Sequence, residues 1–408
     1  MNHFLVYGIH PAISQAETIA VLGVRPTLIG RLALVDDGGM DWNGERVQDR
    51  LAGTVKLGDI VAELPMKHLA AKRLAELIVS RPRASRILFG LTVITDRPAE
   101  AMAYQHLSIE LKRVLQDAGK SVRWVTGDDR GLSPAAISKL DLTQEGYDFV
   151  IGIRDGIATI GLTTHVQNAD AWSARDMGRP FRDTKTGMLP PKLARIMVNL
   201  ALGKETKHNL STPLSLLGET HRLLDPFCGA GTILMEAGVL MEKKFLAGLL
   251  SVQGSDCSAK QVKGAKQNLD WLKEQSIISS ETRQRLSVMM EDARTVDRRH
   301  PPKSITAIVT EGDMGSPLRG GETFATLERQ AAIVSALWRE SLQAFAKIQP
   351  QGGKIVGIWP QYQTSRGKAV VNITDDLAAA GYCLSSVPLP YRRADQSIER
   401  NIVVIERR

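Results

Sequence analysis

The sequence predicts an α/β protein in which a mostly parallel sheet of seven strands is preceded by smaller α+β domains. From residue 189 onward, short apolar strands alternate with helical segments. Such alternation is typical of βαβ units, whose sheet is covered by helices on both faces. Before residue 166 the strands and helices are mixed in order, which indicates α+β domains of modest size.

Each strand of the C-terminal domain, residues 189–408, is a short apolar run. The seven runs are HRLLDPF, LLSVQGSD, LSVMMED, ITAIVTEG, GKIVGIW, CLSSVPLP and NIVVIER. Helical patterns fill most of the intervals, such as residues 231–245, 258–274 and 328–348. No convincing helix separates the last two runs, so we expect these two strands to pair antiparallel.

The N-terminal half divides into two expected domains and a linker. Residues 1–80 read as one α+β domain, in which FLVYGIH is a strand and PAISQAETIAVLG is a helix with capping-box spacing at Ser14 and Glu17. Residues 81–165 read as a second domain that ends in a hairpin. Residues 166–188 are polar and rich in Arg, Asp and Gly, as a linker would be.

Composition narrows the class of protein. The chain has 408 residues, a net charge of +8 and three cysteines, Cys228, Cys257 and Cys383, without metal-ligand spacing. Neither a secretory signal nor a membrane span is recognisable, so we expect a cytoplasmic protein without a membrane partner. The histidines, His165 and His221 among them, also lack ligand spacing, and we expect no metal. The positive charge is compatible with a nucleic-acid partner.

The stretch LLDPFCGAGTILMEA, residues 223–237, carries the main binding signal. Asp225 ends the first strand of the C-terminal domain, at the sheet edge where open α/β sheets bind ligands. Gly229 and Gly231 allow a sharp turn and a close approach of the backbone to a ligand. A helix begins at Thr232, and the Thr232 side chain could cap it. The N-terminus of this helix faces the same space, where anionic groups are favoured.

The identity of the ligand follows from what surrounds the glycines. A Gly-Lys-Ser/Thr sequence for nucleotide phosphates is missing, and so is the third glycine of the dinucleotide fingerprint. An acid ahead of the glycines suits a cofactor with positive charge. S-adenosylmethionine combines a sulfonium with an amino-acid head. Its carboxylate can face the helix N-terminus, and its ammonium can face the acid.

Two further acids end the next two strands. Asp256 could accept hydrogen bonds from the ribose hydroxyls, and Asp292 from the adenine amino group. The predicted cofactor-binding residues are Asp225, Phe227, Gly229, Gly231, Thr232, Asp256, Cys257, Asp292 and Ala293.

These segments, with RDMGRPFRDTKTGMLPPKLARIMVNLA ahead of them, resemble the class I methyltransferases that methylate the exocyclic amine of guanosine in tRNA. The start, FLVYGIHPAISQAE, is similar to the ferredoxin-like domain of that family. Residues 81–165 resemble its THUMP domain, an RNA-binding module. The resemblance implies S-adenosylmethionine as cofactor and tRNA or another structured RNA as partner. We expect a monomer.

The sequence departs from this family after the fourth strand. The family has Asp-Pro-Pro-Tyr followed by glycine, whereas this chain has EGDMG. Glu311 and Asp313 keep hydrogen-bond acceptors and are the predicted catalytic residues. Met314 replaces the aromatic residue that stacks on the target base, and Trp359 could substitute or simply pack. Three functions therefore stay open: guanine-amine methylation, methylation of another nucleic-acid position, and RNA binding without catalysis.

Basic residues before the C-terminal domain are candidates for RNA contacts. Arg175, Arg179, Arg182 and Lys185 could bind phosphates, or they could belong to an ion-pair network. Lys192 and Arg195 continue this basic segment, and Arg392 and Arg393 lie at a predicted turn near the end of the chain.

Overall fold

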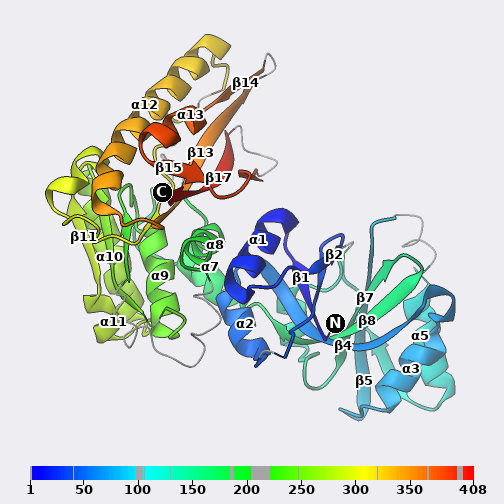
Figure 1. The fold of residues 1–408 in the computed structure, drawn as a ribbon. Helices are drawn as coiled ribbons and strands as arrows, with labels where there is room; N and C mark the ends of the chain where they lie inside the picture. The colour runs from blue at the N-terminus through cyan, green and yellow to red at the C-terminus, as the bar shows by residue number, and fades with distance from the viewer. Residues whose placement is uncertain are drawn as a thin grey trace. The chain divides into compact units, whose positions relative to one another are not determined.

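The computed structural model describes residues 2–39, 41–97, 104, 106–128, 130–183, 188–203, 221–246, 248–318, 320–364, 367–392 and 398–408. The chain forms two compact units, residues 1–19 with 23–171 and residues 20–22 with 172–408 (Figure 1). Within the described ranges, no helix has the length and hydropathy needed to cross a membrane.

The described residues of the N-terminal unit form one sheet of eight strands, in the order β2-β3-β1-β4-β8-β7-β5-β6. The strands are β1 (His3–Tyr7), β2 (Thr27–Ile29), β3 (Leu32–Val35), β4 (Thr54–Pro65), β5 (Arg86–Thr95), β6 (Ser121–Trp124), β7 (Tyr147–Arg154) and β8 (Ile157–Val166). The expected hairpin is present, since β7 and β8 pair antiparallel. The long strand β4 pairs with both β1 and β8, so the segments 1–80 and 81–165 share a single sheet.

The helices of this unit are α1 (Pro11–Leu22), α2 (Gly44–Arg50), η1 (Met66–His68), α3 (Ala71–Val79), α5 (Leu107–Asp117) and α6 (Pro134–Lys139). The capping-box prediction for α1 was wrong, because the helix starts at Pro11 and already includes Ser14. The Ser14 hydroxyl donates to the Gly53 carbonyl, and the Glu17 carboxylate accepts the N–H groups of Ala52 and Gly53. These two side chains therefore fix the turn before β4.

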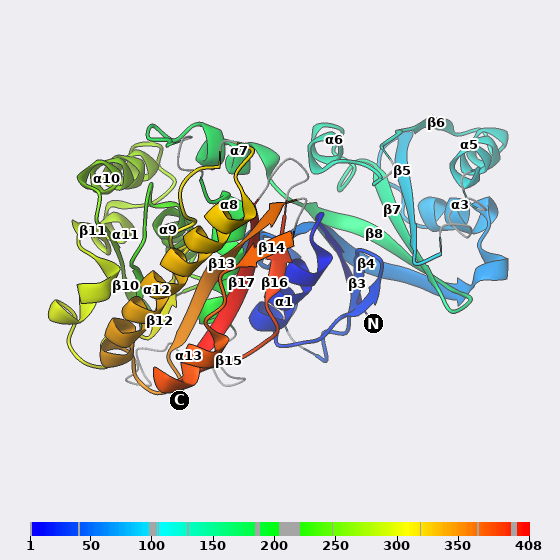
Figure 2. The same cartoon turned by 90° about the horizontal axis from the view of Figure 1, so that it is seen from above.

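The C-terminal unit contains the predicted sheet, with its main strands in the order β11-β10-β9-β12-β13-β17-β15 (Figure 2). They are β9 (His221–Asp225), β10 (Leu249–Asp256), β11 (Leu286–Met290), β12 (Ala307–Val309), β13 (Lys354–Thr364), β15 (Tyr382–Leu384) and β17 (Ile398–Arg407), with β14 (Gly367–Val370) and β16 (Leu389–Tyr391) beside them. The first five are parallel to one another, and β17 runs antiparallel to β13 and β15. The predicted fold class, including the antiparallel final pair, is confirmed.

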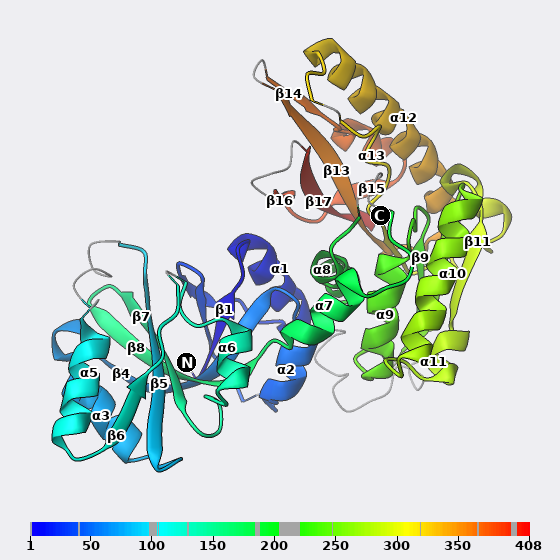
Figure 3. The same ribbon diagram turned by 180° about the vertical axis from the view of Figure 1, so that it is seen from behind.

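Helices cover both faces of this sheet. They are α7 (Ala169–Met177), α8 (Pro191–Leu202), α9 (Thr232–Glu242), α10 (Ala259–Glu274), α11 (Ser280–Gln284), η3 (Ala293–Arg298), α12 (Phe324–Ile348) and α13 (Thr374–Ala379). Leu224 of β9 packs in one core with η3, α12 and α13, while its buried neighbour Leu223 points to the opposite face. On that opposite face α8, α9 and α10 pack side by side (Figure 3).

The segment expected to be a linker, residues 166–188, contains structure of its own. Helix α7 occupies Ala169–Met177, and the division between the two units falls within it, after residue 171. Residues 184–187 of this segment, and with them Lys185, lie outside the described residues. The polar composition of its part after residue 171 reflects ion pairs within the C-terminal unit, which are described below.

Candidate active site

The glycine turn connects β9 to α9 at the carboxyl edge of the sheet. Gly229 and Gly231 adopt φ values of 49° and 80°, in the left-handed region that favours glycine. Gly231 is the N-cap of α9, and no side chain caps the helix. The prediction that Thr232 caps it was wrong, because Thr232 is the first helical residue and its hydroxyl accepts a hydrogen bond from Arg179. The first-turn N–H groups therefore face the ligand space.

Asp225 supplies a buried carboxyl group next to this turn. Its exposed fraction is 1%, and one carboxylate oxygen accepts the N–H of Phe227. Burial, together with the negative charges of Asp256 and Glu311, raises the pKa of Asp225 to about 8. No ion pair with a basic side chain is found for Asp225 among the described residues. Cationic ligands would relieve this concentration of acids.

A pocket opens at the turn and joins predicted residues with others that the sequence did not single out. The predicted lining residues are Asp225, Phe227, Gly229, Thr232 and Glu311. The additional ones are Asp183, Met188, Leu189, Cys228, Ala230, Ile233 and Gln261. Asp183 is 7% exposed and accepts hydrogen bonds from Lys260 and Gln261. Asp183 and Met188 belong to the segment RDTKTGM, which was expected to be part of the linker, and Leu189 is the first residue of the expected C-terminal domain.

The two later acids differ in their surroundings. Both carboxylate oxygens of Asp256 accept backbone N–H groups, from Gly229 at 3.0 Å and Ser258 at 2.8 Å. Asp256 thus ties the glycine turn to the end of β10, and its remaining lone pairs can accept hydroxyl donors. Asp292 caps η3 and forms a salt bridge with Arg294 at 2.6 Å, which lowers the pKa of Asp292. Neither Asp256 nor Asp292 lines the pocket formed by the turn.

The neighbouring small residues serve packing. Ala293 is 3% exposed in the core beside α12. Burial raises the pKa of both the Cys228 and the Cys257 thiols, and nearby carboxylates raise them further. Because a thiolate is the reactive form of cysteine, neither thiol is activated.

The EGDMG loop after β12 has a backbone that proline could not adopt. Gly312, which stands where the family has proline, has φ of 72°, whereas the proline ring holds φ near −65°. Glu311 lines the pocket and accepts a hydrogen bond from Arg400 Nε at 2.8 Å. Asp313 accepts the N–H of Gly315, and the Met314 carbonyl accepts the Tyr362 hydroxyl. The EGDMG loop is therefore held by several hydrogen bonds, and its backbone differs from that of the family's Asp-Pro-Pro-Tyr motif.

The structure does not support Trp359 as a substitute stacking residue. Its exposed fraction is 3%, and it packs with Trp338 and Phe345 in the core of the C-terminal unit. Its ring has no free face for a base. Phe227 is a better-placed aromatic residue, since it lines the pocket and its ring centroid lies 6.3 Å from that of Trp338.

Arg175, a predicted RNA contact, is instead buried in a structural network together with Arg195. Arg175 and Arg195 both form salt bridges with Glu236 of α9, at 2.6 Å each, and Glu236 is fully buried. Both guanidinium groups also lie over the ring of Trp172, 4.4 and 4.5 Å from its centroid. This network fixes α7 and α8 to α9, so the prediction of a phosphate contact for Arg175 was wrong.

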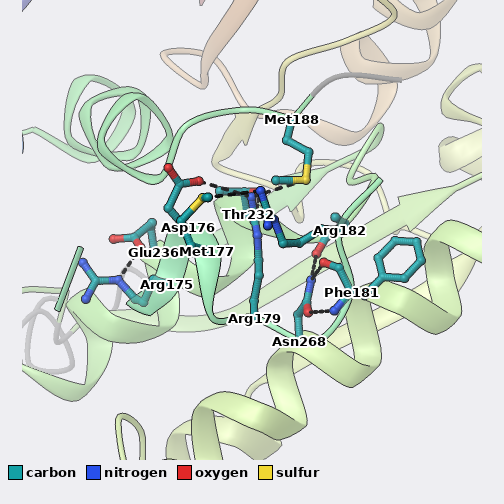
Figure 4. Close-up of polar contacts among 11 residues, drawn as sticks. Arg175, Asp176, Met177, Arg179, Phe181, Arg182, Met188, Thr232, Glu236 and Asn268 are labelled. Atoms are coloured by element: carbon teal, nitrogen blue, oxygen red, sulfur yellow. Dashed lines mark hydrogen bonds and ion pairs between the residues drawn. The ribbon is translucent and has the colours of Figure 1, made fainter. Parts of the chain in front are cut away.

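Of the other basic residues, Arg179 and Arg182 have different surroundings (Figure 4). Arg179 is 2% exposed and bonds Thr232, so it is unavailable to RNA phosphates. Arg182 is exposed and contacts the sulfur of Met177. Arg392 is exposed and donates to Gln363. Lys185 and Arg393 lie outside the described residues.

Comparison with known proteins agrees with this geometry. Residues 179–298 match the family described as UPF0020, RMKL-like, methyltransferase domain. The curated relatives include two named tRNA (guanine(10)-N2)-dimethyltransferase, from Pyrococcus abyssi and Methanothermobacter thermautotrophicus. This chain is 30% identical to the first over 34% of its own length and 35% identical to the second over 46%. The alignments span only 31% and 43% of those two relatives.

Similar solved structures extend over both units. TrmN from Thermus thermophilus aligns over 100% of both chains, with a TM-score of 0.54 and 16% identity. A possible methylase from Clostridium difficile 630 aligns over 99% of this chain and 98% of its own, with a TM-score of 0.50 and 14% identity. At these identities the likeness shows the fold.

The sheet order and the glycine turn define a class I methyltransferase fold. Residues 179–298 are similar to an RMKL-like methyltransferase domain, and this similarity supports S-adenosylmethionine as the cofactor. The site fits this cofactor, because a buried carboxyl group without a counter-charge, Asp225, faces an uncapped helix N-terminus across one turn. The predicted cofactor is thereby confirmed.

Proposed function

We propose that the protein methylates the exocyclic N2 of a guanosine in tRNA. The observation that carries this proposal is the position of Glu311. This residue lines the same pocket as Asp225 and lies just after β12, the strand that pairs with β9. The names of the two curated relatives support N2 of guanine as the acceptor. The bound S-adenosylmethionine would supply an electrophilic methyl group on sulfur.

The residues of the EGDMG loop would act on the acceptor. A guanine amine is a poor nucleophile, so it must be held in line with the bond that breaks. Glu311 and Asp313 present carboxylate oxygens that can accept its N–H hydrogen bonds as positive charge develops on nitrogen. The amine nitrogen would gain the methyl group as its bond to sulfur breaks, the cofactor would become a neutral thioether, and the amine would lose one proton to the carboxylate of Glu311 or Asp313. Methyl transfer of this kind is balanced without a further reactant.

Base binding would rest on apolar contacts rather than on the missing tyrosine. Met314 is partly exposed beside the two acids, and its backbone is held by Tyr362. Phe227 offers the aromatic ring nearest the glycine turn among the pocket residues. For the N-terminal unit we propose RNA binding, with residues 1–80 and 81–165 as its ferredoxin-like and THUMP parts. Arg182 remains the proposed phosphate contact among the described basic residues.

Methyl transfer from labelled S-adenosylmethionine to unmodified bulk tRNA tests the proposal, with the product nucleosides separated afterwards. We expect label in methylated guanosine. The variants Glu311→Gln and Asp313→Asn should lower turnover, whereas Glu340→Gln, an exposed acid on α12, should not. Label in another nucleoside would move the target and favour the altered loop as its cause. Absence of label despite tRNA and cofactor binding would favour an RNA-binding role.

A further inference from the structure

Arg179 is a buried cation whose hydrogen-bonding groups are incompletely matched. Its side chain is fully buried, and its only ion pair among the described residues is with Asp176 at 3.8 Å. Asp176 is 40% exposed, so water weakens that attraction. One terminal nitrogen donates to Met188 sulfur at 3.8 Å, a weak acceptor, and the buried Nε has no partner within the described ranges. Burial lowers the pKa of Arg179.

Two neighbouring arginines, unlike Arg179, each form a close ion pair with a buried acid. Arg175 and Arg195 share the carboxylate of Glu236 at 2.6 Å each and lie against the ring of Trp172. Glu236 attracts Arg179 electrostatically but forms no ion pair with it among the described residues. Holding an arginine out of water without an equivalent acid is unfavourable. Such a cost is offset when a ligand brings the missing negative charge.

Arg179 lies directly behind the wall of the pocket. Its other terminal nitrogen donates to Thr232 Oγ1 at 2.6 Å, and both Thr232 and Met188 line the pocket (Figure 4). Thr232 is the first residue of α9, whose N-terminus carries partial positive charge and has no side-chain cap. Since the Thr232 hydroxyl accepts from Arg179, its own proton is free to be donated onward. The guanidinium of Arg179, the hydroxyl of Thr232 and the N-terminus of α9 thus lie together at this wall of the pocket.

We propose that Arg179 is the counter-charge for the carboxylate of the methionine moiety of S-adenosylmethionine, acting through Thr232 and together with the first turn of α9. Asp225, on the other side of the turn, then faces the cationic part of the same amino-acid head. The inference rests on the methyltransferase part of the proposed function. It is independent of the choice of tRNA, because the cofactor product binds without RNA.

Isothermal titration calorimetry with two ligands tests the assignment. The first is S-adenosylhomocysteine. The second is decarboxylated S-adenosylhomocysteine, which keeps the adenosine, the thioether and the amine but lacks the carboxylate. The wild-type protein should bind the first roughly 10- to 100-fold more tightly, as expected for a charge-assisted hydrogen bond in a buried site. Equal affinities would overturn the proposal without any variant being needed.

Variants locate the effect. Arg179→Met should weaken S-adenosylhomocysteine selectively and bring the two affinities within about 3-fold of each other, by loss of the same charge-assisted interaction. Thr232→Val should do likewise, and Thr232→Ser should restore the difference. Arg298→Met, at an exposed arginine of the same unit, should leave the difference unchanged. A difference that persists in Arg179→Met, or equal weakening of both ligands, would assign Arg179 to structure alone.

Discussion

Arg400 Nε donates to Glu311 Oε1 at 2.8 Å, and this contact fixes the acid that follows β12 to the antiparallel strand β17. Both side chains are largely shielded, with exposed fractions of 10% and 18%. A glutamate has one more rotatable bond than the aspartate of the related motif. The salt bridge therefore supplies the orientation that two prolines would otherwise help to impose.

Removing this anchor should slow catalysis more than it weakens cofactor binding. For Arg400→Gln we expect the turnover number on tRNA to fall by about 10-fold or more, since a small displacement of a positioning group costs rate. Arg400→Lys should recover part of it. Affinity for S-adenosylhomocysteine, measured by calorimetry, should change little. Arg339→Gln, which breaks an exposed ion pair with Asp376 at 2.7 Å, is the matched control. Unaltered turnover in Arg400→Gln would remove the positioning role.

Gly312 should be intolerant of any side chain. A Cβ there would approach the Trp338 ring to 2.8 Å, in addition to the strain of the left-handed backbone. At Gly320, which has φ of 86°, a Cβ would meet nothing within 4 Å. Gly320→Ala thus reports the backbone cost alone, roughly 1 kcal/mol. Gly312→Ala should destabilise the protein more in thermal unfolding and should also lower turnover. Equal melting temperatures for the two variants would contradict the packing argument.

Local sequence signals predicted the frame of the site. The alternation of strands and helices, the aspartate that ends β9 and the two glycines each depend on residues close together in the chain. The conformation of Gly229 and Gly231 follows from the same stretch. That is why the sheet, the turn and the cofactor could be predicted without a structure.

Pairings between distant residues could not be predicted in the same way. Arg175 and Arg195 stand out in the sequence as basic residues. Their partner Glu236 lies in the middle of an apolar helix, and nothing near it in the sequence indicates that it pairs with them. Ser14 and Glu17 have capping spacing, yet their acceptor and donors come from residues 52–53. The sequence around Trp359 does not determine whether its side chain is exposed or buried, because its neighbour in the sheet, β17, comes from a distant part of the chain.

Asp225 predicts a dependence of stability on pH. Its pKa in the folded protein is about 8, against an ordinary value of 3.8. Between those values the folded state binds more protons than the unfolded state, so the free energy of unfolding falls as pH rises through this window. Asp225→Asn lacks this titration. Measured by calorimetry, the melting temperature of the variant minus that of the wild type should therefore increase from about pH 5 to about pH 8. Above about pH 8 this difference should stay constant. A constant difference across the window would argue that Asp225 titrates normally. Saturating S-adenosylmethionine, which favours the ionised form, should reduce the slope in the wild type.

Glu236 should matter for stability far more than its place in a glycine-motif helix suggests. The Glu236→Gln substitution keeps the shape of the side chain but leaves Arg175 and Arg195 without the carboxylate that they share. Loss of one partner of a buried ion pair costs about 3–5 kcal/mol, because the remaining charge stays out of water. In a unit of this size we expect the melting temperature to fall by on the order of 10 °C. Glu340→Gln breaks an exposed pair with Arg294 at 3.2 Å and should cost under about 1 kcal/mol. If the two variants melt alike, the network does not hold α7 and α8 to α9. If Glu236→Gln melts early but binds S-adenosylhomocysteine normally at low temperature, the network supports the fold, and Arg179 remains the separate cation of the binding site.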